Sequence, residues 1–600
     1  MYDLATQRHI ETWTGTSYAN AVSDIKYGYN SMGDLASVAV LKENGQTPAA
    51  VASSTQYDAV GGTSTTNLPN TVYTYDLGGR LSSTFDSSVG VTTTYTYKAN
   101  TNDLQEVKTV NGAGTVLADD VYTYRNDGLK TGATEYTLNA GGASDTVTLT
   151  WQYDGLNRVT SETSSDTASV AALNYTNLYG YDLNSNRVSE TIENGGGTVT
   201  DTITSTYNAD DELTQTVDAN NGTTTYQYDA NGSQISVTSP TGTTTNFYDL
   251  QDRLASVVNK NTSGTVTSSA TYIYDDNSIR IEETTDVSGL LSSVYYLIDG
   301  NNPTGYAQVI EQSATPGTPA ITYIWGETLI QQDNAPGTTN AGIYYLIADA
   351  HGSTRMLVNS TGSVVQTYNY DGSGNALGFT PSSAITEYLY NQQHYDVISG
   401  QYYMRARNYD PATGTFTQQD TISPSPGDLA NANLFLFAGA DSINMFDPSG
   451  HDLMETLGSL AIQSMIGSII SPAIAPFASD ALSLLIPSWV TQGMLDAVPD
   501  AALIGGNLSG FWRAGASPVS LGITGGLDLP LSAKDHYAAL YDYAGGSLGF
   551  GGSGPRMIGG SLAVTVYRSA ANIRNNGCAV KRRWFSAGDK PARQIGRSSR

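Results

Sequence analysis

Cysteine is almost absent from the chain, which has one thiol, Cys578, in 600 residues. One thiol cannot close an intrachain disulfide, and it cannot form the cysteine cluster of a structural metal site. The sequence therefore excludes a disulfide scaffold and leaves the redox compartment open. We expect neither a metal nor another cofactor.

Charged residues are also scarce, at 14% of the chain, whereas Gly, Thr, Ser, Asn and Tyr are abundant. This composition is typical of β-strands joined by tight turns. Residues 1–450 hold 47 acidic and 16 basic residues, a net charge of −31, and residues 451–600 hold 9 acidic and 12 basic residues, a net charge of +3. An acidic body repels phosphates, so we expect no strong nucleic-acid binding by the first part of the chain.

No secretory leader is visible at the start of the chain. Met1 is followed directly by Tyr2-Asp3-Leu4-Ala5, without the basic and apolar regions of a signal peptide. The start has the pattern of a repeat that continues along the chain. It favours the interpretation that this reading frame is the C-terminal part of a longer repeat array.

Tyrosine recurs at an imperfect period over residues 1–342. Steps of 18 to 29 residues separate the second aromatic residue of successive short motifs, or words, of the type Tyr-x-Tyr-Asp. This spacing indicates one supersecondary unit per step. These aromatic residues are Tyr29, Tyr57, Tyr75, Tyr97, Tyr124, Tyr153, Tyr181, Tyr207, Tyr228, Tyr248 and Tyr274. The chain is also too long for one ordinary domain, so two or more units are expected.

The best-preserved copy of the repeat predicts a β-hairpin. Tyr226 and Tyr228 are two residues apart and share one face of a strand. Asp229 to Gly232 then supplies a turn, and residues 234–237 return as the second strand. A lone hairpin is marginal in water, so the units are expected to pair edge to edge in one continuous sheet. Core packing is the favoured role of the tyrosines, and a carbohydrate-binding platform is the alternative.

Residues 388–450 carry five linked words in one order. The words are Gly400-Gln401-Tyr402-Tyr403-Met404-Arg405-Ala406-Arg407-Asn408-Tyr409-Asp410-Pro411, Gly414-Thr415-Phe416, Asp420, Asn433-Leu434-Phe435 and Asp447-Pro448-Ser449-Gly450. They closely resemble the core segment that ends the repeat arrays of RHS/YD-repeat proteins. Residues 344–355 and 368–375 resemble the words that open this core.

The resemblance implies a mainly β fold, in which the hairpins wind into a large hollow shell and a core segment closes one end. An array of 342 residues is short for a closed container, so a partial shell stays open as an interpretation. The implied domains are the repeat array at 1–342, the RHS repeat-associated core at 343–450, and a variable C-terminal domain of mixed α/β structure at 451–600.

The resemblance also implies chemistry at three residues. In RHS proteins that release their C-terminal part, the core cuts its own chain after the Asp-Pro-x-Gly word with two aspartates and an arginine, which match Asp420, Asp447 and Arg407. Two close carboxyls disfavour double ionisation, so one could polarise the scissile carbonyl while the other activates water. The arginine could orient one of them. The expected scissile bond is His451-Asp452 or one beside it.

Two positions depart from the family pattern around these residues. His451 stands where the family usually has leucine, and Thr421 replaces the proline that usually follows the aspartate matched by Asp420. The competing interpretation is that the aspartates are turn residues and the arginine belongs to a structural ion pair. A Ser/His/Asp triad at His351 is rejected, since no Gly-x-Ser-x-Gly elbow accompanies it and a turn histidine explains the pattern.

The C-terminal part is different in composition, because 4 of the 40 tyrosines lie after Gly450. Residues 456–479 carry no charge, but their prolines favour amphipathic or buried helices within 453–500; membrane contact is the minority interpretation. Glycine-rich alternation at 515–570 predicts a small β segment, and the basic end at 575–600 predicts a disordered tail. No nuclease, deaminase or ADP-ribosyltransferase signature is present.

Several functions agree with these observations. The first is a delivery protein that encloses a C-terminal effector and severs it, in competition between bacteria or in host interaction, with an immunity protein or a secretion-system component as partner. The second is a surface or extracellular structural protein whose array mediates adhesion or contacts carbohydrate. The third is a fragment left by recombination at the repeats. The resemblance implies a secreted or cell-surface location.

Overall fold

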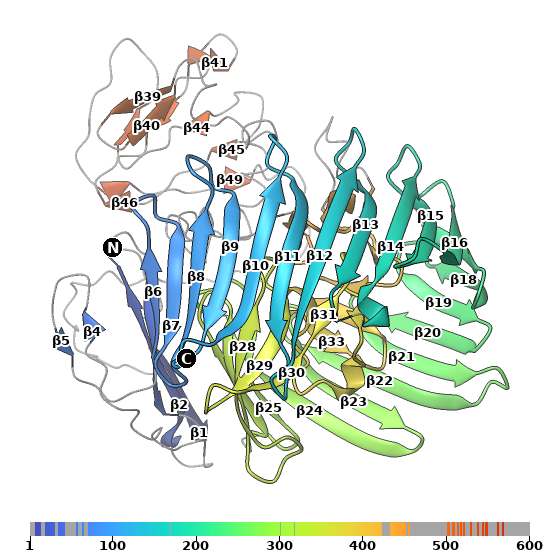
Figure 1. The fold of residues 1–600 in the computed structure, drawn as a ribbon, viewed down its shortest axis with the longest axis horizontal. Coiled ribbons are helices and arrows are strands. Elements are labelled where there is room, and N and C mark those ends of the chain that lie inside the picture. The colour runs from blue at the N-terminus through green and yellow to red at the C-terminus, as the bar shows by residue number, and fades with distance from the viewer. Residues whose placement is uncertain are drawn as a thin grey trace, which may run out of the picture. The chain divides into compact units, whose positions relative to one another are not determined.

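The computed structural model describes residues 7–13, 18–30, 34–42, 56–57, 63–64, 70–168, 170–300, 302–316, 318–422, 433–451 and 454–455, together with short strands between 501 and 568. The chain divides into two compact units, Met1–Leu485 and Ile486–Arg600. Nearly all the regular structure of the first unit is β-strand (Figure 1).

Twenty-eight strands of the first unit form one antiparallel sheet. They are β1 (Gln7–Trp13), β2 (Tyr18–Tyr29), β3 (Leu35–Lys42), β6 (Asn70–Tyr75), β7 (Leu81–Asp86), β8 (Val91–Tyr97), β9 (Leu104–Val110), β10 (Val116–Tyr124), β11 (Lys130–Leu138), β12 (Ser144–Tyr153), β13 (Val159–Asp166), β14 (Tyr175–Tyr181), β15 (Arg187–Asn194), β16 (Val199–Tyr207), β17 (Leu213–Asp218), β18 (Gly222–Tyr228), β19 (Gln234–Ser239), β20 (Gly242–Tyr248), β21 (Leu254–Asn261), β22 (Val266–Tyr274), β23 (Arg280–Val287), β24 (Leu290–Asp299), β25 (Gln308–Ser313), β26 (Ile321–Trp325), β27 (Leu329–Asn334), β28 (Gly342–Ala348), β29 (Thr354–Asn359) and β30 (Val364–Thr367). Among the described strands, β1 and β30 each pair with one neighbour, so the sheet is open. The predicted fold class, a wall of paired hairpins forming a partial shell, is confirmed.

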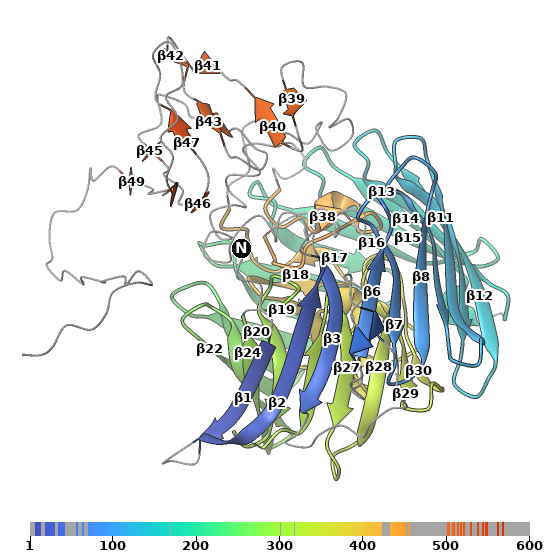
Figure 2. The same cartoon turned by 90° about the vertical axis from the view of Figure 1, so that its left-hand side faces the viewer.

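The sheet curls until its first strands face its last ones. One cluster of buried side chains joins Tyr27 and Val38, on β2 and β3, to Ile324 on β26. A second cluster joins Val91 on β8 to Met356 on β29. Figure 2 shows β2 and β3 beside β27 and β28. The two ends of the array are therefore held together by side-chain packing.

The best-preserved repeat folds as its sequence predicts. β18 ends at Tyr228, and Gly232 in the following turn has a φ of 76°. The Asp229 carboxylate accepts hydrogen bonds from the backbone N–H groups of Asn231 and Ser233, at 2.9 and 3.0 Å. These bonds satisfy backbone groups where the strand ladder stops, so the Tyr-Asp word sets both the end of the strand and the turn.

The second tyrosine of the repeat word makes a contact that the sequence does not reveal. Its hydroxyl donates a hydrogen bond of 2.6 to 3.1 Å to a backbone carbonyl at or near the start of an earlier strand of the sheet. The pairs are Tyr75 to Leu35, Tyr97 to Leu81, Tyr124 to Leu104, Tyr153 to Lys130, Tyr181 to Val159, Tyr207 to Arg187, Tyr248 to Gln234 and Tyr274 to Leu254. The bonds link each of these repeats to the one before it.

One of these bonds can be tested by removing a single hydroxyl. Tyr181→Phe should lower the free energy of unfolding by about 1 kcal/mol, because the Val159 carbonyl loses a donor while the packing stays. Tyr395→Phe is the matched control, since the Tyr395 hydroxyl makes no hydrogen bond to the described residues, and it should cost less than about 0.5 kcal/mol. Denaturant unfolding measures both values. Equal losses in the two variants would contradict this role for the hydroxyl.

Residues 368–451 pack against the concave side of the sheet (Figure 1). Their elements are β31 (Asn369–Tyr370), β32 (Ala376–Leu377), η2 (Pro381–Ser383), η3 (Tyr390–Gln392), β33 (His394–Asp396), β34 (Gln401–Met404), β35 (Arg407–Asp410), β36 (Thr415–Phe416), η4 (Ala438–Ala440) and β37 (Met445–Phe446). One buried cluster joins Tyr402, Tyr409 and Phe437 of this segment to Tyr323 and Trp325 of the wall. Strands β28 to β30 belong to the same sheet as the array, so the sheet continues past residue 342.

Buried charges tie the core segment to distant strands of the wall. Lys130, on β11, donates from Nζ to the Ile443 carbonyl at 3.1 Å, and burial lowers the pKa of this lysine to about 8. Arg280, on β23, pairs with Asp396 of the core at 3.1 Å. Because these contacts lie many strands apart, the core segment fixes the curvature of the wall around itself.

Smaller elements complete the described parts of the chain. They are η1 (Ala171–Leu173), β4 (Gln56–Tyr57), β5 (Thr63–Ser64), β38 (Met454–Glu455) and, in the second unit, β39 (Ala501–Ile504), β40 (Asn507–Gly510), β41 (Arg513–Ala514), β42 (Ser517–Pro518), β43 (Ser520–Gly522), β44 (Leu529–Pro530), β45 (Tyr537–Ala538), β46 (Tyr543–Ala544), β47 (Ser547–Gly549), β48 (Ser561–Leu562) and β49 (Tyr567–Arg568). The predicted helical segment at 453–500, apart from β38, and the basic end at 575–600 lie outside the described residues. Within the described residues, no helix has the length and apolar character needed to span a membrane.

Candidate functional site

Arg407, the first residue of β35, lies between the carboxylates of Asp420 and Asp447. Its Nη2 is 2.8 Å from Asp420 Oδ2 and 3.3 Å from Asp447 Oδ2. The side chains of Arg407, Asp420 and Asp447 are 5%, 11% and 4% exposed, so solvent screens these ion pairs weakly. Burial lowers the pKa of Arg407, and the two carboxylates oppose that shift. The structure thus brings together the three residues that the sequence selects.

The same guanidinium also contacts the backbone. Arg407 Nε donates to the carbonyl of Gly450, and Nη1 donates to the carbonyl of Leu434 at 2.9 Å. Its Cζ lies 3.6 Å from the centre of the Phe416 ring, which covers one face of the cation. Arg407 therefore holds both carboxylates and the last carbonyl of the Asp-Pro-Ser-Gly word with one side chain.

Asp447 organises the backbone that follows it. Its Oδ1 accepts hydrogen bonds from the N–H groups of Gly450 and His451, at 2.8 and 3.0 Å, and from the Ser449 hydroxyl at 3.1 Å. Local bonds of this kind are also typical of turn aspartates. The geometry therefore agrees with both interpretations of Asp447 that the sequence leaves open.

The Asp-Pro-Ser-Gly word is held from both sides. Arg405 donates to the carbonyl of Pro448 and, at 3.0 Å, to Oε1 of Gln393. Gly450 has a φ of 78°, and a Cβ at this position would lie 2.4 Å from the carbonyl oxygen of Met404. Only glycine fits here without a shift of the backbone, so the peptide after the word is set in one position.

His451 contacts the site, although the sequence gives it no role there. Its Nδ1 lies 2.8 Å from Asp420 Oδ1, which also accepts the N–H of Ile422 at 2.8 Å. The imidazole is 29% exposed. The two residues are 31 positions apart, so no local spacing predicts the pair. The one available signal was the histidine itself, in a position where the family usually has leucine. Asp452 lies outside the described residues.

His351 packs in the core, and it forms no catalytic triad with the described residues. Its ring stacks on Tyr390 with centroids 5.7 Å apart, and its Nε2 lies 3.1 Å from the Met445 carbonyl. Burial lowers the pKa of His351 to about 4, and the nearby Lys130 adds to the shift. The folded protein therefore keeps this histidine neutral.

The neutral His351 should make stability depend on pH. The unfolded chain binds a proton near pH 6.5, and the folded chain binds it only near pH 4, so this contribution is complete above pH 6.5 and is lost as the pH falls towards 4. We expect a loss of about 2 kcal/mol, less than the full linkage energy because His351 borders a cavity. Denaturant unfolding across this range should show a smaller acid loss in His351→Gln than in the wild type. Equal losses in both would contradict the assignment.

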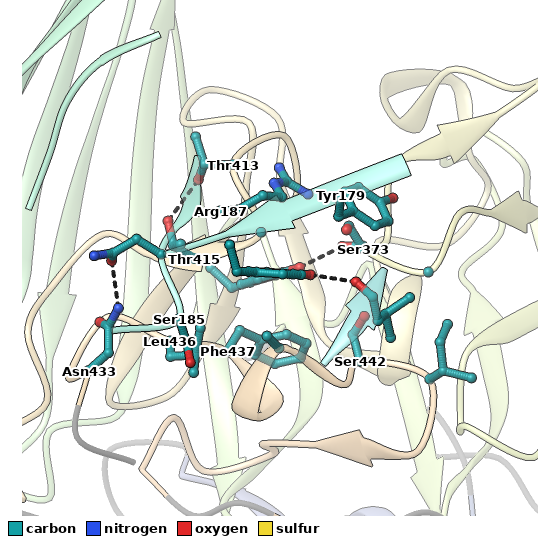
Figure 3. A pocket seen from close by; sticks show the side chains of 18 of the residues that line it. Tyr179, Ser185, Arg187, Ser373, Thr413, Thr415, Asn433, Leu436, Phe437 and Ser442 are labelled. Carbon is teal, nitrogen blue, oxygen red and sulfur yellow. Dashed lines mark hydrogen bonds between the residues drawn. The ribbon is translucent and has the colours of Figure 1, made fainter. Parts of the chain in front are cut away.

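Two cavities lie beside the core segment. One of about 40 Å³, between β13 to β15 and the core, is lined by Arg187, Phe437 and Asn433 (Figure 3). It has room for a few water molecules and not for a substrate. A larger one of about 160 Å³ borders Arg405 and Pro448, close to the bridged carboxylates.

Within the described part of the chain, no group of three or more His, Cys, Asp or Glu side chains could hold a metal ion.

Hairpins that carry a Tyr-Asp word and curl around a segment ending in Asp-Pro-Ser-Gly are the arrangement that the resemblance to RHS/YD-repeat proteins implies. Residues 207–244 match the family model described as RHS Repeat. The resemblance to RHS/YD-repeat proteins that the sequence predicts is confirmed.

The similar proteins are much longer than this chain. The tRNA nuclease WapA of Bacillus subtilis (strain 168) is 28% identical over 301 residues, which cover 50% of this chain and 12% of the relative. Salivary gland surface protein 1 of Aedes aegypti is 30% identical over 139 residues, which cover 23% of this chain and 4% of the relative. Among solved structures, the crystal structure of TcdB2-TccC3-TEV matches 74% of this chain and 23% of that chain, with a TM-score of 0.52 and 15% identity. This last match shows a shared fold.

Proposed function

We propose that the β wall and its core carry the C-terminal segment 452–600 as an effector module and sever it by self-cleavage beside His451. The observation that carries the proposal is the Arg407 guanidinium, which contacts Asp420, Asp447 and the Gly450 carbonyl at once. A cation on a carbonyl oxygen favours attack at its carbon, because it stabilises the negative charge that develops on that oxygen.

The remaining contacts give each aspartate a part in the reaction. Asp447 holds the N–H groups of Gly450 and His451, and so fixes the peptide in one orientation. Asp420 lies on the other side of Arg407 and supplies the second carboxylate. The carbonyl is polarised by the arginine, so neither carboxyl needs to carry a proton for that purpose.

The similar proteins support an effector role for the released segment. One relative is named a tRNA nuclease, and the wall has the fold of the TcdB2-TccC3-TEV structure. In this proposal the protein is secreted or displayed at a cell surface, and a cell that makes it needs a partner that neutralises the released module. The segment 452–600 carries no motif that identifies its target.

A structural or adhesive role is the second candidate. It is favoured by the turn-like hydrogen bonds of Asp447 and by a relative named as a surface protein. In that case the ion pairs of Arg407 hold the core together and nothing is cut, and exposed parts of the wall contact carbohydrate or another surface.

Denaturing electrophoresis and intact-mass measurement of the full chain separate the two candidates. Self-cleavage should give two species that divide beside His451. Asp447→Ala should leave a single species, because alanine offers no acceptor to the N–H groups of Gly450 and His451 and the rate falls about 100-fold or more. A wild-type protein that stays intact over a wide range of pH would contradict the proposal and support the structural role.

A further inference from the structure

We infer that His451 is the general base of the self-cleavage and that the bond cut is Gly450-His451. The inference rests on the proposed function, and it assigns a base and a bond within the same site. It moves the cut by one position from His451-Asp452, the bond expected from the sequence.

Both sides of the Gly450-His451 peptide are engaged by the site. Arg407 Nε donates to the Gly450 carbonyl. The N–H of His451 donates to Asp447 Oδ1 at 3.0 Å and to the Ser449 hydroxyl at 3.1 Å. A peptide whose oxygen meets a cation and whose nitrogen is fixed is already oriented for attack at its carbon.

The aspartates are poorly placed to act as the base. One carboxylate oxygen of Asp420 pairs with Arg407, and the other contacts the N–H of Ile422 and the imidazole of His451. One carboxylate oxygen of Asp447 pairs with Arg407, and the other accepts hydrogen bonds from backbone N–H groups and from the Ser449 hydroxyl. Both carboxylates are therefore already engaged by a cation and by other donors.

The imidazole of His451 has the arrangement that a base requires. In the tautomer whose Nδ1–H donates to Asp420, Nε2 keeps a free lone pair. Nε2 makes no hydrogen bond to the described residues, and the ring is open to solvent on one side. Many hydrolases use a histidine that an aspartate orients in this way as their general base. The ring also belongs to the residue that supplies the leaving nitrogen, which tethers it beside the carbonyl.

The reaction consumes one water and balances without a further reactant. His451 Nε2 takes a proton from water as the water oxygen bonds to the carbonyl carbon of Gly450, and Arg407 Nε holds the resulting oxyanion. The bond from that carbon to the His451 nitrogen then breaks, and Nε2 returns its proton to the leaving nitrogen. The products are a carboxyl group on Gly450 and a free α-amine on His451.

The pH dependence separates this route from one driven by two aspartates. Among the described residues, the charged groups around the imidazole are Asp420, Arg407 and Asp447. A histidine that acts as general base accepts a proton only in its neutral form, so the cleavage rate should rise with pH. A route that needs a protonated aspartate would be fastest in acid.

The test uses the full chain, purified at about pH 5 and moved to higher pH. His451→Ala should cut about 100-fold more slowly than the wild type, and free imidazole in the buffer should restore cutting, whereas an equal concentration of salt should not. His451→Gln, which keeps a polar side chain of similar reach, should stay slow without imidazole. Circular dichroism confirms that the variants are folded, and mass measurement should give a first fragment that ends at Gly450.

The outcomes separate the role of His451 from the proposed self-cleavage itself. A rate that rises with pH, a cut after Gly450 and rescue by imidazole support the assignment. Cutting of His451→Ala at the wild-type rate, or a first fragment that ends at His451, overturns the assignment and leaves the proposed self-cleavage in place. A wild-type chain that is never cut overturns both.

Discussion

Arg407→Met should stop self-cleavage and lower the free energy of unfolding by about 3 kcal/mol. Methionine keeps much of the apolar contact with the Phe416 ring but removes the cation between Asp420 and Asp447. Two buried carboxylates of like charge then remain without the cation between them. Removing one member of a buried ion pair is costly because it leaves an uncompensated charge.

Arg125→Met is the matched control for this loss of charge. The guanidinium of Arg125 lies 2.6 Å from Asp127 Oδ2, but the two side chains are 39% and 40% exposed. Water already solvates both groups, so the variant should lose less than about 1 kcal/mol. Denaturant unfolding of both variants measures the difference. Equal losses in the two variants would show that burial of the Arg407 ion pairs adds nothing to the free energy of unfolding.

The loss in Arg407→Met should also depend on pH and on its neighbours. Without the cation, the two buried carboxylates repel each other in the folded chain, and this repulsion weakens as the pH falls and a proton neutralises one of them. The deficit should therefore shrink towards pH 4. Adding Asp447→Asn to Arg407→Met should restore part of the lost stability, because one of the two repelling charges is removed. A deficit that is constant from pH 4 to 8 would contradict the electrostatic explanation.

The repeat unit was predictable because its determinants are local. Tyr228, Asp229 and Gly232 set the strand end, the side-chain bonds of the turn and its positive φ within five residues. The curl of the wall was expected from the family resemblance and not from the repeat itself, because it depends on pairs such as Tyr27 with Ile324 that are far apart in the sequence. The hydroxyl bond from Tyr181 to Val159 was missed for a similar reason, since it requires the order of the strands.

In the candidate site, too, the residues could be predicted from short motifs but their contacts could not. Matching words selects Arg407, Asp420 and Asp447, because each belongs to a short segment with its own pattern. It cannot show that Arg407 reaches the Gly450 carbonyl or that His451 returns to Asp420, since these contacts depend on how the chain folds between the words. A residue that departs from a family pattern beside a reactive site is therefore a candidate for a role of its own.

Gly450→Ala should slow self-cleavage about 100-fold, because it displaces the scissile peptide from the groups that hold it. A Cβ at this position would lie 2.4 Å from the Met404 carbonyl oxygen and 2.9 Å from the Arg407 backbone nitrogen, and the φ of 78° is itself unfavourable for alanine. Gly79→Ala is the matched control, since Gly79 has a φ of 77° and open space around it. It should lose about 1 kcal/mol of stability and cut at the wild-type rate. Time courses on denaturing gels compare the two variants, and equal cutting by both would mean that the close approach of Gly450 to β34 and β35 does not position the bond.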